Sequence, residues 1–234
     1  MARVNHTKSD GKSKNPATKF LEWKSNEMVF SYYDKSAGQN RTQELPFRFL
    51  FLQHYHNVKG WHERSQGGLW SNEVYYIGSE PITVRAFKEQ GAPIASGLYK
   101  DIKAKVNAAG GKYHRSVYGV DANGSIINLQ FKGSVVSAWS DFIEKNGSKL
   151  ENNWVDVNGF IEMKKGMVSY TVPKFTVGEA LSPSDAIKVD DAASVFQDYI
   201  DDYFAKGDVD NSVPTDLGST GTKLGVDMSV KDLY

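Results

Sequence analysis

Aromatic and cationic residues stand side by side in four segments that the sequence predicts to be strands. The segments are Tyr32–Lys35 (YYDK), Phe47–Phe49 (FRF), Arg85–Lys88 (RAFK) and Lys112–Arg115 (KYHR). A planar ring can stack on a nucleobase, and a neighbouring Lys or Arg can neutralise a phosphate. The structural alternative is that these rings lie in the core, as about half of the side chains on such strands must. The set favours a surface for single-stranded nucleic acid.

Ten side chains are the predicted nucleic-acid contacts. The cations expected to hold the phosphate backbone are Lys35, Arg41, Arg48, Arg85, Lys88, Lys112 and Arg115. The rings expected to stack on bases are Tyr33, Phe87 and Tyr113. Along Ile82–Lys88 the apolar side chains alternate with Thr83, Arg85 and Phe87, so the second face is a binding face or an ordinary solvent face. Trp61 and Trp70 are interpreted as core or rim residues, and Trp139 as core.

The formal net charge of zero conceals two oppositely charged parts. Residues 1–180 contain 24 of the 28 basic and 17 of the 28 acidic residues, whereas residues 181–234 contain four basic and 11 acidic ones. A basic body with an acidic C-terminal part indicates a polyanionic partner. The acidic part then either competes for the binding surface or recruits other proteins.

Other chemistry has little support in the sequence. His54 and His56 have the i, i+2 spacing that places two imidazoles on one strand face, as a zinc site needs, but surface or stacking histidines are favoured. The motifs HExxH, GxSxG, GxGxxG and the P-loop do not occur. The acidic pairs Asp190–Asp191 and Asp201–Asp202 are interpreted as a solvated helix face. We therefore expect a protein that is not an enzyme and that uses no metal or cofactor.

Cysteine usage and hydropathy suggest a cellular compartment. The chain contains no Cys, so disulfides and thiolate metal sites are excluded. Its basic, polar N-terminus lacks the apolar segment of a secretion signal, and no stretch approaches the roughly 18 apolar residues of a membrane span. We expect a soluble, cytoplasmic protein with no membrane association.

The periodicities predict a mainly β chain with a few helices. Predicted strands are Glu27–Asp34, Phe47–Gln53, Leu69–Ile77, Ile82–Lys88, Lys112–Val120, Ser125–Phe131, Gly159–Met163 and Met167–Phe175. Predicted helices are Gly97–Ala109, Val135–Asn146 and residues 185–206. The economical arrangement is an antiparallel, partly closed barrel of the OB-fold type, with a sandwich as the alternative.

Four parts follow along the chain. Residues 1–18 form a flexible basic arm, either without a role or adding phosphate contacts, and 19–178 form the OB-like domain. Residues 179–207 form an acidic amphipathic helix, and 208–234 a disordered acidic tail. The residues predicted to contact protein partners are Phe196, Tyr199, Tyr203, Phe204, Leu233 and Tyr234. The alternative for 185–206 is a helix packed permanently on the body.

The order of several motifs resembles the single-stranded DNA-binding proteins of bacteriophages. The motifs are WKSNEMVFSYYDK, LPFRFLFL, KGWHE, LWSNEV, ITVRAFK, GLYKDIK and GGKYHRSVYGV, which lie within residues 20–145. The resemblance implies an OB-fold that coats single-stranded DNA during replication or recombination in the host cytoplasm. It also implies an acidic tail that contacts replication proteins, although the chain ends in Leu233–Tyr234 rather than Pro-Phe.

A second class of function remains open. A phage structural or carbohydrate-binding β-domain also exposes Trp and Tyr, and Ser71, Asn72 and Glu73 could hydrogen-bond to sugar hydroxyls. A sugar site, however, needs neither a basic body nor an acidic part that cancels its charge. The charge distribution therefore favours single-stranded DNA.

Overall fold

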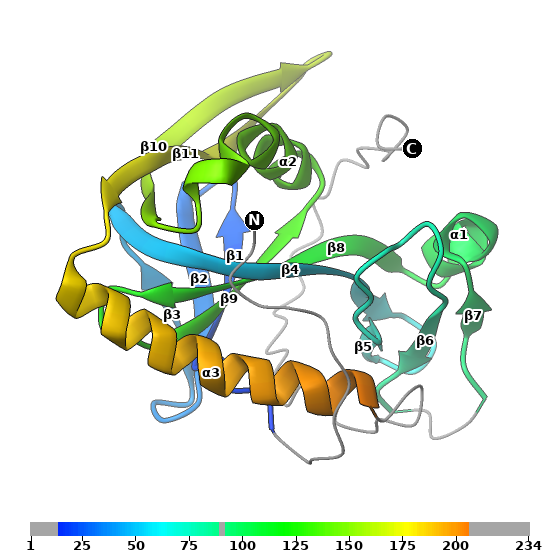
Figure 1. Cartoon of the computed structure of the whole chain (residues 1–234). Coiled ribbons are helices and arrows are strands. Elements are labelled where there is room, and N and C mark those ends of the chain that lie inside the picture. The colour runs from blue at the N-terminus through cyan, green and yellow to red at the C-terminus, as the bar shows by residue number, and fades with distance from the viewer. Residues whose placement is uncertain (1–13, 89–91, 206–234) are drawn as a thin grey trace.

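Strand β4 (Phe47–His62) runs through both halves of the molecule and organises the sheet (Figure 1). The computed structural model describes residues 14–88 and 92–205. Along one edge, β4 pairs with β8 (Gly111–Asp121) from Phe49 to Gly60. Its other edge is shared, because its first residues pair with β10 (Asn153–Lys165) and its last with β5 (Gly67–Ser71). One long strand therefore holds two groups of strands in a single sheet.

Within the described ranges, eleven strands form one sheet that does not close into a barrel. The remaining strands are β1 (Lys19–Lys24), β2 (Val29–Asp34), β3 (Gln39–Gln43), β6 (Ile82–Ala86), β7 (Ala95–Gly97), β9 (Ile126–Lys132) and β11 (Val168–Ala180). The path of paired strands runs β3-β2-β1-β9-β8-β4-β5-β6-β7, with β10 also on β4 and β11 on β10. Neighbouring strands are antiparallel, except for the parallel pair β1 and β9.

The mainly β class is confirmed, but the predicted barrel closure is wrong. Closure would join the two ends of the sheet, and β3 and β7 stand at opposite ends of the path. The physical reason is the length of β4, which pairs with β10 at its start and with β5 at its end. The relation of this fold to the OB-fold stays a prediction. The predicted tail 208–234 and most of the arm 1–18 lie outside the described residues.

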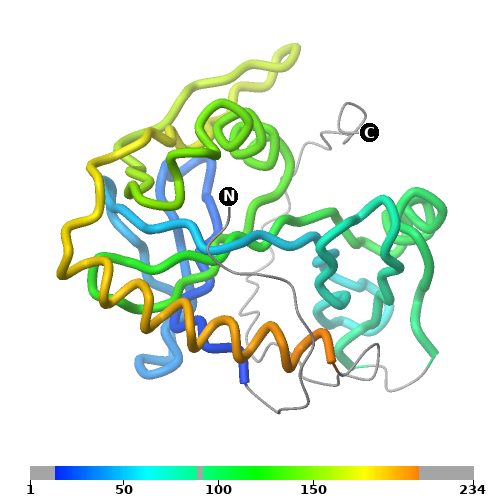
Figure 2. The backbone as a smooth tube through the Cα atoms, in the orientation of Figure 1, coloured from blue at the N-terminus to red at the C-terminus, as the bar shows by residue number. Residues whose placement is uncertain are grey.

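Three α-helices, all expected from periodicity, pack on the sheet (Figures 1 and 2) within the described residues. They are α1 (Tyr99–Ala108), α2 (Ser134–Asn146) and α3 (Pro183–Ala205), and the 3₁₀ turn Gly147–Lys149 follows α2. Helix α2 inserts the fully buried Trp139 into the main core, beside β11. Helix α3 lies across the sheet and packs by Val189, Phe196 and Ile200 on a second apolar cluster.

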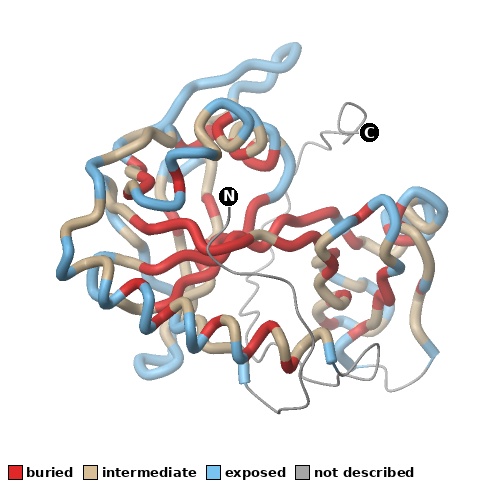
Figure 3. Tube along the Cα trace, viewed as in Figure 1, coloured by how far each residue is buried: buried red, intermediate tan, exposed pale blue. Residues whose placement is uncertain are grey.

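The two apolar clusters lie on opposite faces of β4 and β8. Phe49, Phe51 and Val58 belong to the main core, whereas Leu50 and Tyr55 belong to the cluster beneath α3. Figure 3 shows these central strands as the most continuously buried part of the molecule. Burial on both faces explains why Phe47–Gln53 contains almost no polar residue.

Candidate nucleic-acid interface

A row of cationic and aromatic side chains crosses four neighbouring strands. Lys112 on β8 lies opposite Lys59 on β4, Lys59 lies opposite Trp70 on β5, and Trp70 lies opposite Arg85 on β6. Residues directly opposite one another in antiparallel strands project from the same face of a sheet. The register therefore places the four side chains on one face, one strand apart.

Two further aromatic residues extend this row toward the turn end of the strands. Trp61 is two residues beyond Lys59, pairs with Gly68 and is 37% exposed. Phe87 is two residues beyond Arg85, donates its backbone N–H to the Gly68 carbonyl at 2.8 Å and is 51% exposed. We call the set the cationic-aromatic face, and its members are Lys59, Trp61, Trp70, Arg85, Phe87 and Lys112.

The face curves toward the N-terminal strand β1. The Lys59 ammonium lies 5.9 Å from the centre of the Phe20 ring, although β9 and β8 separate their strands in the sheet. Three strand spacings amount to about 14 Å, and the register places Phe20 in line with Tyr118, six residues along β8 from the Lys59 partner Lys112. The contact therefore requires the sheet to bend around Lys59. An extended ligand that lies in such a concave surface can contact several side chains at once.

Glycine permits the tight backbone packing at the end of β4. A Cβ on Gly60 would lie 2.1 Å from the Gly110 carbonyl oxygen, so no side chain fits there. Gly110 itself has a φ of +89°, a conformation that favours glycine, and a Cβ there would lie 2.1 Å from the Trp61 carbonyl oxygen. These close approaches hold the end of β4, which includes Trp61, against the backbone of Gly110.

Burial changes the titration of Lys59. Burial lowers the pKa of its ammonium to about 8, while the carboxylates of Glu73 and Glu22 act in the opposite direction. Lys59 is therefore mostly charged at neutral pH and loses its charge in mildly alkaline solution. A phosphate beside the Lys59 ammonium would stabilise its charge in place of the water that burial removes.

A layer of polar side chains separates Lys59 from α3. Glu73 accepts hydrogen bonds from Tyr118 Oη at 3.0 Å and from Asn57 Nδ2 at 3.3 Å. Asn57 also donates to Ser116 Oγ at 2.9 Å. Burial raises the pKa of Glu73, and these hydrogen bonds and Lys59 act against that shift. The layer fixes Asn57, which precedes Lys59 by two residues on the same face of β4.

Three of the predicted contacts, Arg85, Phe87 and Lys112, come together on this face. The alternation on β6 is as expected, because Ile82, Val84 and Ala86 are buried on the other side. Lys112 is exposed at the start of β8. The strand pattern alone could separate the two faces here because every second residue is apolar.

The predicted contacts of Tyr113 and Arg115 with nucleic acid are wrong, because both side chains are buried on the opposite face. Tyr113 is 5% and Arg115 is 6% exposed. The Tyr113 hydroxyl hydrogen-bonds to His56 Nδ1, and the Arg115 guanidinium donates to Ser140 Oγ of α2 at 2.8 Å. Alternation explains the error, since Lys112 cannot share a face with Tyr113 or Arg115, which are one and three residues further along the strand.

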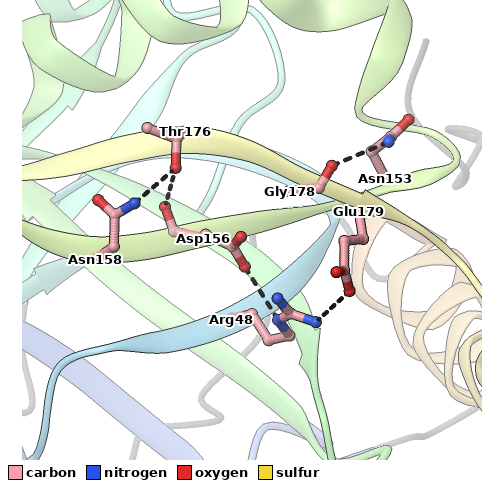
Figure 4. A network of polar contacts seen from close by, with 7 residues as sticks. All are labelled: Arg48, Asn153, Asp156, Asn158, Thr176, Gly178 and Glu179. Atoms are coloured by element: carbon pink, nitrogen blue, oxygen red, sulfur yellow. Dashed lines mark hydrogen bonds and ion pairs between the residues drawn. The ribbon is translucent and has the colours of Figure 1, made fainter.

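Arg48 and Lys88 lie away from the cationic-aromatic face. Figure 4 shows the Arg48 guanidinium between Asp156 of β10, at 3.0 Å, and Glu179 of β11, at 3.4 Å. Two carboxylates compensate its charge, so Arg48 ties β4 to the β10–β11 pair. Lys88 packs its aliphatic stem against Gly67, a residue opposite His62 on the other side of the pleat.

The β2–β3 hairpin contains the remaining predicted contacts, at the far edge of the sheet. Tyr33 pairs with Asn40, and Arg41 forms an ion pair with Asp34 at 2.9 Å. Lys35 lies in the turn between the strands. Strands β1, β9 and β8 lie between this hairpin and β4 in the order of the sheet, and no residue of the hairpin belongs to the register row of Lys59.

The predicted partner-binding ring residues of the C-terminal helix contact the body of the protein. Phe196 is fully buried with its ring centre 4.5 Å from that of Tyr118, and Tyr199 is 7% exposed. The Tyr203 hydroxyl accepts a hydrogen bond from the Glu73 backbone N–H at 2.6 Å, and Phe204 packs on Tyr55. Helix α3 is thus part of the fold, as the alternative prediction stated. Leu233 and Tyr234 lie outside the described residues.

His56 is buried and His54 is half-buried, with its ring centre 5.9 Å from that of the core residue Phe51. Burial, followed by the nearby Arg115 charge, lowers the pKa of each imidazole to about 3. His62 is apart from them and hydrogen-bonds to Ser65 Oγ at 2.9 Å. Among the described residues, no three His, Asp or Glu side chains gather as metal ligands.

Sequence reasoning did not assign Lys59, Trp61 and Trp70 to the binding surface. The available signal was the spacing of Asn57, Lys59 and Trp61, which occupy every second position and therefore share one face of a strand. It was missed because the predicted strand ended at Gln53, whereas β4 continues to His62.

No family model, curated protein or solved structure matches the chain. In the part of the chain that the structure describes, no helix has the length and apolarity to cross a membrane.

Proposed function

We propose that this protein is a non-enzymatic, sequence-tolerant single-stranded DNA-binding protein that binds along the cationic-aromatic face. The observation that carries the proposal is the register row Lys112–Lys59–Trp70–Arg85, which gathers three cations and one indole on one face. Its aromatic extension, Trp61 and Phe87, is exposed.

Each part of the face has a distinct role in this proposal. Lys59, Arg85 and Lys112 neutralise successive phosphates and release their counterions. Trp61 and Phe87 provide flat apolar surfaces on which bases stack, worth about 1–3 kcal/mol for each base. Neither interaction reads a base edge, so binding tolerates any sequence. A role in phage replication or recombination, and recruitment of replication proteins by residues 208–234, are further parts of the proposal.

The carbohydrate alternative is weakened by the hydrogen bonds of its three candidate residues. Ser71 Oγ accepts from the Val58 N–H and donates to the Asn72 carbonyl, both at 2.8 Å. Asn72 uses its side-chain oxygen for the Thr83 N–H at 2.6 Å, and Glu73 accepts from Asn57 and Tyr118. These groups are occupied within the fold, whereas sugar recognition requires donors and acceptors directed at the ligand.

Fluorescence anisotropy of labelled oligo-dT, measured from low to high salt, tests the proposal. We expect binding at low salt, with log K falling against log salt by about 0.7 for each phosphate contact. An oligosaccharide competitor and a double-stranded DNA of equal charge serve as controls. Absence of binding at low salt, or an affinity that does not change with salt, would overturn the proposal.

A further inference from the structure

The β10–β11 hairpin extends past the core and exposes an apolar surface. Its outer part, residues 160–168, which we call the hairpin arm, contains five exposed apolar side chains, and Met167 at the turn is 98% exposed. The five are Phe160, Ile161, Met163, Met167 and Val168. Ile161 and Met163 share one face of β10, and Val168 lies opposite Lys165 on that same face. Clustered exposed apolar residues of this kind mark an interaction surface.

The arm also carries a net positive charge. Lys164 and Lys165 stand at its tip, opposite Ser169 and Val168, while Glu162 is its single carboxylate. Lys165 projects from the same face as Ile161 and Met163. A matching partner surface is therefore apolar with negative charge beside it.

The outward face of α3 has the complementary composition. Ile187 is 66% and Val195 is 53% exposed, and Asp191 lies midway between them at the i+4 position of each step. Asp190 and Asp198 flank this ridge, with Lys188 as its one cation. The inward face of α3 is already used by Phe196 and Ile200, so the ridge is the face that remains for a partner.

The arm and the ridge cannot meet within one molecule. Figure 1 shows the tip of the β10–β11 hairpin and α3 on opposite sides of the sheet. Contact between two arms would bring four lysines together, which like-charge repulsion disfavours. We propose that the hairpin arm of one copy docks on the α3 ridge of a second copy, with Lys164 and Lys165 beside Asp191.

This head-to-tail contact is heterologous, so a chain of any length keeps one unused arm at one end and one unused ridge at the other. Repetition then generates open chains rather than closed dimers. The association itself does not depend on nucleic acid. A consequence that does rest on the proposed function is cooperative binding, because neighbours bound to one DNA strand would also contact one another.

Sedimentation velocity of the full chain at low salt, over a range of concentrations, tests the contact with two variants. The arm variant combines Lys164→Glu, Lys165→Glu and Met167→Ser, and the ridge variant combines Asp191→Ala and Val195→Ser. All five positions are exposed, and circular dichroism confirms folding of each variant. The control, Lys100→Glu with Lys105→Glu on α1, changes as much charge at exposed sites elsewhere.

We expect wild type and control to form dimers and longer chains, and each variant alone to stay monomeric. An equimolar mixture should form heterodimers and nothing longer, because one intact arm meets one intact ridge. A ridge variant that still self-associates, or a mixture that stays monomeric, would overturn the contact. Association of wild type without any oligo-dT binding would instead overturn only the proposed function.

Discussion

One face of strand β4 changes character at its middle, and the two halves have different fates. In the first half, Leu50, Leu52 and Tyr55 are fully buried beneath α3. In the second half, Asn57 belongs to the polar layer and is followed by the cationic and aromatic pair Lys59 and Trp61. The comparison shows that one continuous strand can supply a core and a binding surface, with the boundary set by where its side chains stop being apolar.

The helix side of this boundary should respond to mutation through stability. Phe196→Ala removes a fully buried ring that packs on Tyr118, so we expect the free energy of unfolding to fall by about 3–5 kcal/mol. Chemical denaturation measures the change. The matched control is Val195→Ala, whose exposed side chain should alter stability by less than about 0.5 kcal/mol. Equal effects would show that α3 does not pack as described.

The binding side should respond through affinity. Replacement of Phe87 by Ala should weaken oligo-dT binding by about 1–3 kcal/mol at every salt concentration, since stacking involves no counterions. Its unfolding free energy should change little because the ring is half exposed. Tyr113→Ala, which removes a buried ring of β8 on the opposite face, should do the reverse. A Tyr113→Ala variant that stays stable but binds poorly would mean that the two faces are assigned the wrong way round.

Lys59 should make binding sensitive to alkaline pH. Its pKa of about 8 means that wild type carries this charge at pH 7 and has mostly lost it at pH 9. Between these values the salt slope of oligo-dT binding should become shallower by about 0.7. Lys59→Arg stays charged throughout and should keep its slope. If both proteins change alike, another group titrates.

The smallest effect should come from cations outside the face. Lys88→Gln changes a residue that packs over Gly67 on the other side of the pleat, and we expect oligo-dT affinity within about twofold of wild type. Anisotropy titration measures it directly. A loss as large as that of Lys112→Gln would extend the binding surface around the strand edge.

Local pattern predicted the elements, and pairing distant in sequence decided the site. The alternation in Ile82–Lys88 and the three helix periodicities needed only neighbouring residues, and all are confirmed. In KYHR both alternating sets are polar, so the pattern could not show which set is buried. Arg48 carried a binding prediction because its partner Asp156 is 108 residues away. Closure of the sheet likewise depends on strand pairing that periodicity does not encode.

The salt dependence of binding in a Lys59→Gln, Lys112→Gln double variant tests the central claim most directly. The two lysines face each other across β4 and β8, and the claim is that both neutralise phosphates. Against oligo-dT, the slope of log K with log salt should be shallower than that of wild type by about 1.4. A Lys100→Gln, Lys105→Gln variant on α1 should keep the wild-type slope. An unchanged slope in the first variant, or an equal loss in both, would contradict the cationic-aromatic face as the binding surface.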